Sequence, residues 1–136
     1  TWATLNNTPF RRYKHFTHEG GISSAFVAHW PRGISQELHG KLEKQPAHLI
    51  DVMATAVDLS NAKYPTKFNH HDILPMEGVS LRPAFAGQSL ERKQPIFWEH
   101  EGNKAVRDGK WKLVLRHKQP WQLFDMDADR TEQHER

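Results

Sequence analysis

Apolar and polar positions alternate with different periods along the chain, and each period predicts a different kind of element. Residues 1–21 are polar and aromatic and end in Gly20-Gly21, which predicts an irregular loop that stops at a turn. Residues 22–30 contain the almost unbroken apolar run Ala25-Phe26-Val27-Ala28, closed by Pro31. Such a run is typical of a strand buried on both faces, so we expect a parallel or mixed sheet covered by helices.

A helical period follows in residues 46–60. Apolar residues recur there at spacings of three and four, while Asp51, Thr55 and Asp58 fill other positions. The pattern predicts an amphipathic helix with Pro46 at its first position, where a missing N–H costs no hydrogen bond. Residues 64–94 are rich in proline and glycine, which predicts a long connection with one short helix near residues 81–85.

After residue 95 the period becomes two, which indicates strands. Residues 96–98 begin a strand, Gly102-Asn103 turns the chain, residues 104–107 return, and Asp108-Gly109 is a strong hairpin signal. Two further strands are expected, one in which Trp111, Leu113 and Leu115 alternate with Lys110, Lys112 and Val114, and one at residues 121–124. Together they predict an antiparallel sheet with one face in water.

Two smaller expectations concern this C-terminal half. The tryptophans fall at strand spacings, so we expect Trp98, Trp111 and Trp121 to lie in a core rather than on a sugar-stacking surface. Asp129 and Glu132 form a D-x-x-E pattern that resembles a capping box, which predicts a helix beginning there.

Length and composition limit the possible classes of protein. The 136 residues suit one domain, or the remnant of one domain with a small second layer. Because the sequence starts at Thr1 and stops in a charged stretch, we expect it to be an excerpt of a longer chain. The 19 Lys and Arg residues against 16 Asp and Glu are scattered, so we expect no nucleic-acid partner. No run approaches the roughly 18 apolar residues of a membrane helix, so no membrane partner is expected either.

Candidate chemistry gathers in the loop before the predicted buried strand. Arg11, Arg12, Lys14, His15 and His18 lie there within eight residues. In α/β folds such loops line the ligand crevice, and fixed positive charges suit an oxyanion such as phosphate or sulfate. The alternative is a solvated basic loop whose Gly20-Gly21 pair serves only the backbone.

Metal and thiol chemistry find no support in the sequence. The chain has no cysteine, which removes disulfides, thiolate metal sites and a cysteine nucleophile. It has ten histidines but no H-E-x-x-H, and His70-His71 is interpreted as a surface doublet. Because zinc usually requires three or four convergent nitrogen or sulfur ligands, we expect this segment to bind no metal.

Four ordered motifs resemble one family. The pattern K-x-x-x-x-E-G-G before an apolar strand ending in W-P is filled by Lys14, Glu19, Gly20 and Gly21. HLIDVMATAVDL resembles the next helix of that family, EGVSLRPAFAG its connection, and FWEHEGNKAVRDGKWKLV with WQLFDMDADRTE its C-terminal sheet. In order and spacing, the whole chain resembles the C-terminal portion of a type I, arylsulfatase-like sulfatase.

The resemblance implies a fold class and a division into domains. Residues 1–76 would be the final part of an α/β, alkaline-phosphatase-like domain, with the lysine loop, buried strand and amphipathic helix. Residues 77–136 would hold the connection and an appended antiparallel-sheet α+β subdomain.

The resemblance also assigns roles. Lys14 would contact the sulfate group and neutralise charge on its oxygens, and Glu19 would orient the loop. His100, in W-E-H-E-G-N, would lie at the rim of the same cleft and donate a proton or a hydrogen bond to the leaving oxygen; the alternative is a surface histidine. Arg11 and His18 are substrate-binding candidates through proximity to Lys14 alone.

The chain departs from the family in its nucleophile and metal site. Sulfatases make formylglycine in a C/S-x-P-x-R motif, whereas Ser80 here precedes Leu81-Arg82-Pro83 in the wrong order. The aspartates and the Asp-Asn pair of the calcium site are absent, and Ala25 stands where proline is expected. Ca²⁺ and formylglycine are therefore expected in the full-length parent, and this segment alone should be inactive.

Several alternatives stay open. The chain could be a non-catalytic module that binds sulfated or acidic glycans, or part of a related phosphodiesterase or phosphonate hydrolase. Expected partners are the rest of the parent chain and a sulfated small-molecule or glycan substrate. Oligomeric state and compartment are not fixed, although the resemblance fits a periplasmic, secreted or lysosomal protein.

Overall fold

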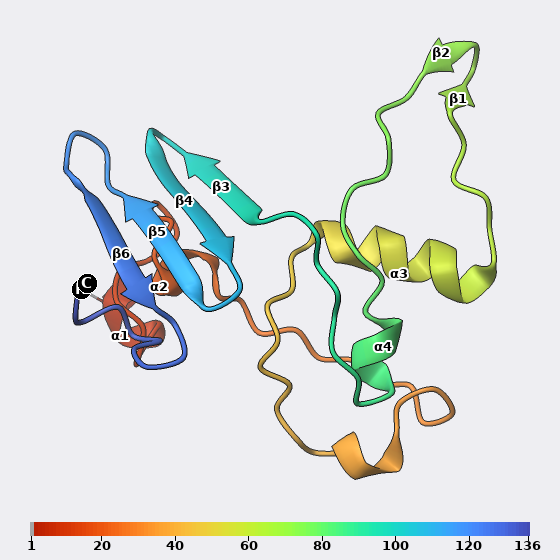
Figure 1. Cartoon of the computed structure of the whole chain (residues 1–136), viewed down its shortest axis with the longest axis horizontal. Coiled ribbons are helices and arrows are strands. Elements are labelled where there is room, and N and C mark those ends of the chain that lie inside the picture. Colours follow the sequence, from red (N-terminus) through yellow and green to blue (C-terminus); the bar gives the residue numbers. More distant parts are fainter. Residues whose placement is uncertain (1) are drawn as a thin grey trace. The chain divides into compact units, whose positions relative to one another are not determined.

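A computed structural model describes residues 2–136. The chain forms two compact units (Figure 1). The first unit combines Thr1–Val27 with Gln94–Arg136, and the second unit comprises Ala28–Lys93. These units group residues by their contacts within this chain. The division at residue 76 concerns the domains of a longer protein and stays a prediction.

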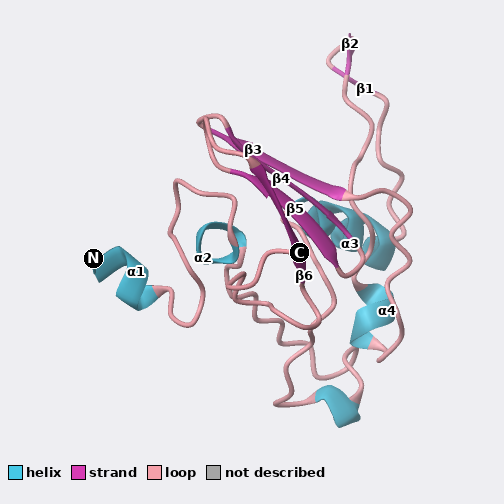
Figure 2. Ribbon diagram, turned by 60° about the vertical axis from the view of Figure 1, so that its left-hand side comes forward, coloured by secondary structure: helices cyan, strands magenta, loops and turns pink. Residues whose placement is uncertain are grey.

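An antiparallel sheet forms the centre of the first unit. Its strands follow one another in the order β3-β4-β5-β6, as the alternating pattern and the hairpin signals predicted (Figure 2). The turns use backbone conformations that favour glycine: Gly102 has φ +78° and Gly109 has φ +53°. The strands are β3 Ile96–His100, β4 Asn103–Asp108, β5 Trp111–Leu115 and β6 Trp121–Asp125.

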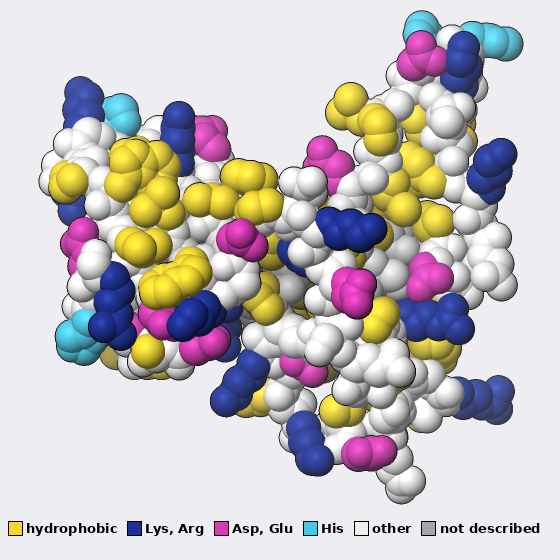
Figure 3. Space-filling model, in the orientation of Figure 1, with side chains coloured by type: hydrophobic (Ala, Val, Ile, Leu, Met, Phe, Trp, Pro, Cys, Tyr) yellow, Lys and Arg dark blue, Asp and Glu magenta, His cyan; other side chains and the backbone are white. Residues whose placement is uncertain are grey.

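One face of this sheet carries a small core. Ala105, Val114, Phe124 and Met126 are buried together, and Trp98 packs against them, which confirms the prediction for Trp98. Trp111 and Trp121 are 42% and 46% exposed, so their assignment to the core was wrong. Figure 3 shows apolar side chains gathered at the surface over this sheet.

Trp111 is exposed because the buried face of β5 is the one that carries Lys112 and Val114, not the one that carries the apolar residues Trp111, Leu113 and Leu115. Lys112 and Val114 are fully buried, and because successive side chains alternate between faces, Trp111 is turned outward. Lys112 can be buried because its ammonium group forms ion pairs with two carboxylates, those of Glu19 and Glu132. The ion pairs of Lys112 with Glu19 and Glu132 therefore explain why the alternation of polar and apolar residues in β5 does not predict which side chains are buried.

The N-terminal part of the first unit contains two short helices, α1 Trp2–Asn6 and α2 Glu19–Ile22. The strand predicted for residues 22–30 is not formed: residues 23–30 lack regular structure, with Phe26 62% and Val27 88% exposed. A strand buried on both faces needs hydrogen-bonded neighbours, and no segment within residues 2–136 pairs with this one.

The second unit contains the predicted amphipathic helix, α3 Ile50–Ser60. It begins at Ile50 rather than at Pro46, and just before its first turn the Asp51 carboxylate accepts a hydrogen bond from the His48 N–H at 2.7 Å. It ends at Asn61, whose φ of +52° is left-handed. The remaining elements are η1 Gln36–Leu38, the small β1 Lys67–Phe68 and β2 His71–Asp72 pair, and the predicted short helix, α4 Arg82–Phe85.

The polar side of α3 faces inward. Asp51 and Thr55 are buried, whereas Leu49 and Met53 are 82% and 57% exposed. Asp51 Oδ1 accepts the Val79 N–H at 2.9 Å, and Thr55 Oγ1 accepts the Leu81 N–H at 2.9 Å. The helix therefore organises the residue 78–81 connection through hydrogen bonds.

The C-terminal tail forms no helix, so the capping-box prediction was wrong. Glu132 has φ +56° and is fully buried with its carboxylate beside Lys112, which removes it from the role of an N-terminal helical residue. None of the helices in residues 2–136 has the length and apolar character needed to cross a membrane.

Candidate functional site

A buried ionic cluster fixes the end of the loop that carries Lys14. The Lys112 Nζ atom lies 2.8 Å from Glu19 Oε1 and 2.8 Å from Glu132 Oε1. The backbone N–H of Glu19 also donates to Glu132 Oε2 at 2.9 Å. Burial raises the pKa of Glu132, against the attraction of Lys112. The cluster ties α2 to β5 and to the C-terminal tail, which is the loop-orienting contact expected of Glu19.

The two glycines after Glu19 allow the loop to fold back on itself. A Cβ atom on Gly20 would collide with the carbonyl oxygen of Arg11, and one on Gly21 with that of Phe16. Gly20 donates its N–H to the Arg11 carbonyl at 3.1 Å. The close approach of the backbone therefore explains why glycine occupies both positions after Glu19 in this chain.

His100 lies beside the loop that carries Lys14. The rings of His15 and His100 are stacked with centroids 6.1 Å apart, and His15 Nδ1 lies 2.9 Å from Glu101 Oε2. This hydrogen bond from His15 lowers the pKa of Glu101. Lys14 is exposed and forms no ion pair within residues 2–136, so its ammonium is available to a ligand.

Asn103 holds the two histidines in place, and the sequence analysis missed it. Its buried side-chain amide donates to the carbonyl of His15 at 2.8 Å and to that of His100 at 3.1 Å. Its Oδ1 accepts the N–H of His117 at 3.1 Å. The only sequence signal was its place after Glu101-Gly102, where the turn of the first hairpin ends.

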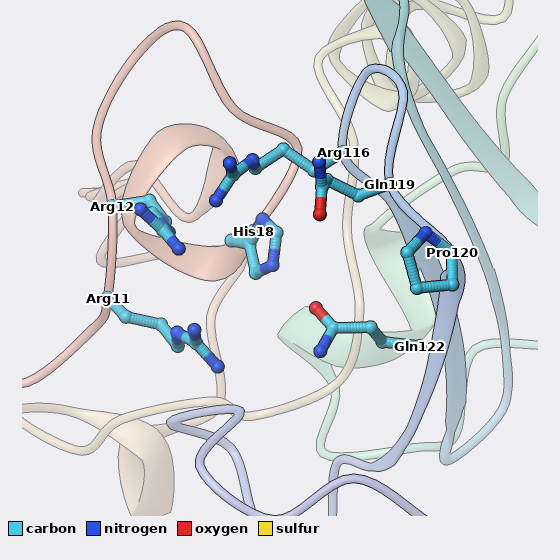
Figure 4. Close-up of a pocket in the computed structure, with 7 residues that line it drawn as sticks. All are labelled: Arg11, Arg12, His18, Arg116, Gln119, Pro120 and Gln122. Atoms are coloured by element: carbon cyan, nitrogen blue, oxygen red, sulfur yellow. The ribbon is translucent and has the colours of Figure 1, made fainter.

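Arg11 and His18 lie in a separate pocket, which we call the arginine pocket (Figure 4). Its volume is about 130 Å³, and neither Lys14 nor His100 lines it. The sequence analysis missed the contributions of the β5–β6 turn and of β6. The lining residues are Arg11, Arg12, His18, Arg116, Gln119, Pro120 and Gln122.

The electrostatics of the arginine pocket favour an uncharged His18. Burial lowers the pKa of His18 to about 4, and Arg11 and Lys112 contribute to the shift, while Gln122 opposes it. Burial also lowers the pKa of Arg12, with repulsion from Arg11 and Arg116 adding to the effect. The pocket thus concentrates positive charge around a neutral imidazole.

The expected cofactors of the parent do not fit residues of this chain. Within residues 2–136, one cluster of metal-ligand side chains occurs, formed by exposed His15, His100 and Glu101 with ligand atoms within 4.8 Å of one another. Two imidazoles and one carboxylate do not resemble the six to eight oxygen ligands that Ca²⁺ takes. The sequence also has no cysteine and no C/S-x-P-x-R motif from which formylglycine could be made.

Comparison with known proteins points to one family. No family model matches the chain. An uncharacterized sulfatase of Schizosaccharomyces pombe is 26% identical over 138 residues, covering 96% of this chain and 24% of that protein. The choline-sulfatase of Rhizobium meliloti is 34% identical over 107 residues, covering 74% of this chain and 19% of the enzyme. The N-acetylgalactosamine-6-sulfatase of Mus musculus is 30% identical over 128 residues, covering 91% of this chain and 22% of the enzyme.

Solved structures agree with these relatives. The crystal structure of Ps i-CgsB is similar to this chain, with a TM-score of 0.69 and 28% sequence identity. The match covers 94% of this chain and 28% of the Ps i-CgsB chain. The same protein has been solved in complex with k-i-k-neocarrahexaose. The chain thus spans about a fifth to a quarter of the length of the curated relatives it matches. On these matches the chain belongs to the sulfatase family, whose C-terminal portion it resembles.

Proposed function

We propose that this chain supplies the sulfate-binding lysine and part of the substrate cleft of a sulfatase that hydrolyses sulfate esters. The observation that carries the proposal is the position of Lys14. It is exposed and without an ion pair in the described chain, and the adjacent His15 stacks on His100. The Glu19–Lys112 pair anchors the other end of the same loop.

The proposed mechanism gives each residue one task. The Lys14 ammonium binds the sulfuryl oxygens and offsets the negative charge that grows on them during the reaction. His100 donates a proton, or a hydrogen bond, to the leaving oxygen of the ester. Asn103 and Glu101 position His100 and His15 through the contacts described above. The nucleophile and the Ca²⁺ that sulfatases generally use would come from other parts of the full-length protein.

Exposed apolar residues support a role for the rest of the parent chain. Phe26 and Val27 in the first unit and Val52 and Met53 on α3 are between 43% and 88% exposed. Surfaces of this kind are usually covered by another part of the protein. We propose that residues 1–76 complete an alkaline-phosphatase-like α/β domain, which covers these side chains, and that residues 77–136 form its appended subdomain.

The substrate class is proposed from the relatives. Their names include choline-sulfatase and N-acetylgalactosamine-6-sulfatase, and a similar structure holds k-i-k-neocarrahexaose. We propose a sulfated carbohydrate as the substrate. The arginine pocket favours a second candidate, a module that binds sulfated glycans without hydrolysing them. A related phosphodiesterase or phosphonate hydrolase would be recognised by its nucleophile segment.

Hydrolysis of a sulfated carbohydrate, and of an aryl sulfate, by the full-length protein tests the proposal. Lys14→Ala should lower kcat/KM by a factor on the order of 100 to 1,000, which is the range measured for loss of one group that stabilises developing charge. Lys41→Ala, which removes an exposed lysine of the second unit, is the matched control and should leave the rate unchanged. An active protein that tolerates Lys14→Ala would refute the role of Lys14. The 136-residue chain alone should show no turnover.

A further inference from the structure

We propose that the arginine pocket is an oxyanion-binding site for one sulfate or phosphate group, separate from the site of Lys14. The inference does not depend on sulfatase activity, because it rests on a pocket that contains neither Lys14 nor His100. Figure 4 shows the side chains of Arg11, Arg12 and Arg116 around the ring of His18, with the amide of Gln122 on the opposite side.

Among residues 2–136, the three guanidinium groups have no anionic partner. No carboxylate of residues 2–136 lies within ion-pair distance of Arg11, Arg12 or Arg116, and no acidic residue lines the pocket. Arg11 donates only to the backbone carbonyl of Glu132, whose carboxylate is engaged by Lys112. Like charges gathered in a partly buried place repel one another, so an anion bound among them would be stabilised by all three.

His18 supplies an independent sign of a missing ligand. It is 1% exposed, and neither of its ring nitrogens has a hydrogen-bond partner of good geometry among residues 2–136, although the nearby Gln122 amide raises its pKa. Buried polar atoms are nearly always paired, so an unpaired imidazole in a pocket calls for a partner. A neutral imidazole donates from one nitrogen, and the Gln122 amide can donate from its NH₂ group. An anion would accept hydrogen bonds from both.

Size and shape select the class of ligand. The arginine pocket has a volume of about 130 Å³. This volume admits one tetrahedral oxyanion. Guanidinium groups pair with sulfate and phosphate oxygens in a bidentate fork, which distinguishes these anions from chloride. The anion can be a free ion or a sulfate group that projects from a glycan.

Equilibrium dialysis of radiolabelled sulfate against the purified full-length protein tests the site. In the Lys14→Ala background, one sulfate per chain should still bind, and adding Arg116→Gln should weaken it by at least about tenfold. Arg32→Gln, an exposed arginine of the second unit, is the matched control. Unlabelled phosphate should compete and chloride at equal ionic strength should not. Binding that Arg116→Gln leaves unchanged, or no binding at all, would overturn the proposal.

A second measurement needs no variant and so covers the case in which Arg116→Gln fails to fold. Saturating sulfate should raise the pKa of His18, followed by NMR of its ring, because the anion offsets the positive groups that face it: Arg11, Arg12, Arg116 and Lys112. An unchanged titration would count against the site. In the dialysis experiment on the Lys14→Ala protein, displacement of labelled sulfate by a sulfated hexasaccharide would identify the ligand as a glycan sulfate group. Failure to displace it identifies the free ion as the ligand.

Discussion

The Nζ atom of Lys112 lies 2.8 Å from Oε1 of Glu19, and both side chains are buried. The pair joins positions 93 residues apart, one on a strand of the sheet and one at the end of the loop that carries Lys14. A charged contact at such a distance along the chain makes the placement of the lysine loop depend on the sheet. It also explains why a lysine occupies an inward-facing position of β5.

Lys112→Met should be strongly destabilising. It leaves Glu19 and Glu132 buried without the cation between them, and breaking a buried ion pair from one side typically costs about 3–5 kcal/mol. Urea unfolding of the purified protein measures the loss. Lys110→Met is the control, because Lys110 pairs with Asp125 while 47% exposed and should cost less than about 1 kcal/mol. Equal losses in the two variants would contradict the importance assigned to the cluster.

His18 should make stability depend on pH. Burial lowers its pKa from 6.5 to about 4 in the folded protein, so between these values the unfolded chain binds the additional proton. Stability should therefore rise as pH increases from about 4 to 6.5, by up to about 3 kcal/mol. Urea unfolding at pH 4.5, 5.5 and 7 measures the slope. His18→Gln should reduce this slope, and an undiminished slope would assign the effect to other groups.

Gly78→Ala should destabilise the second unit more than Gly87→Ala does. Gly78 has φ +88°, and a Cβ atom there would lie 2.7 Å from the carbonyl oxygen of Ile50. Left-handed strain alone costs about 1–2 kcal/mol, and the collision adds to it. Gly87→Ala is the control, because Gly87 also has positive φ but faces open space. Thermal unfolding compares the two, and equal shifts would show that the contact with α3 does not matter.

Local signals predicted the local parts of the fold. The hairpins of β3–β6 were read from alternation and from Asp108-Gly109, and α4 from a short apolar stretch. The errors concern burial that depends on distant partners. Lys112, Asp51 and Thr55 are polar in the sequence but buried, because residues far along the chain satisfy their hydrogen bonds and charges.

The same distinction applies to the candidate sites. Lys14, His100, Arg11 and His18 could be named because they belong to motifs or lie near one. Arg116, Gln122 and Asn103 belong to strand ends and turns, and only the folded sheet brings them to the loop. Periodicity describes the polarity of one segment and carries no information about which segment it will meet.

The role proposed for His100 predicts a dependence on the leaving group. If His100 donates a proton to the leaving oxygen, His100→Asn should slow esters with basic leaving groups by about 100-fold or more. It should slow p-nitrophenyl sulfate far less, because nitrophenolate leaves without a proton. Rates of the full-length protein on aryl sulfates of graded leaving-group pKa measure this slope. Lys14→Ala is the comparison and should lower all the rates by similar factors, since its charge acts on the sulfuryl oxygens. A slope that His100→Asn leaves unchanged would reduce His100 to a contact that binds substrate.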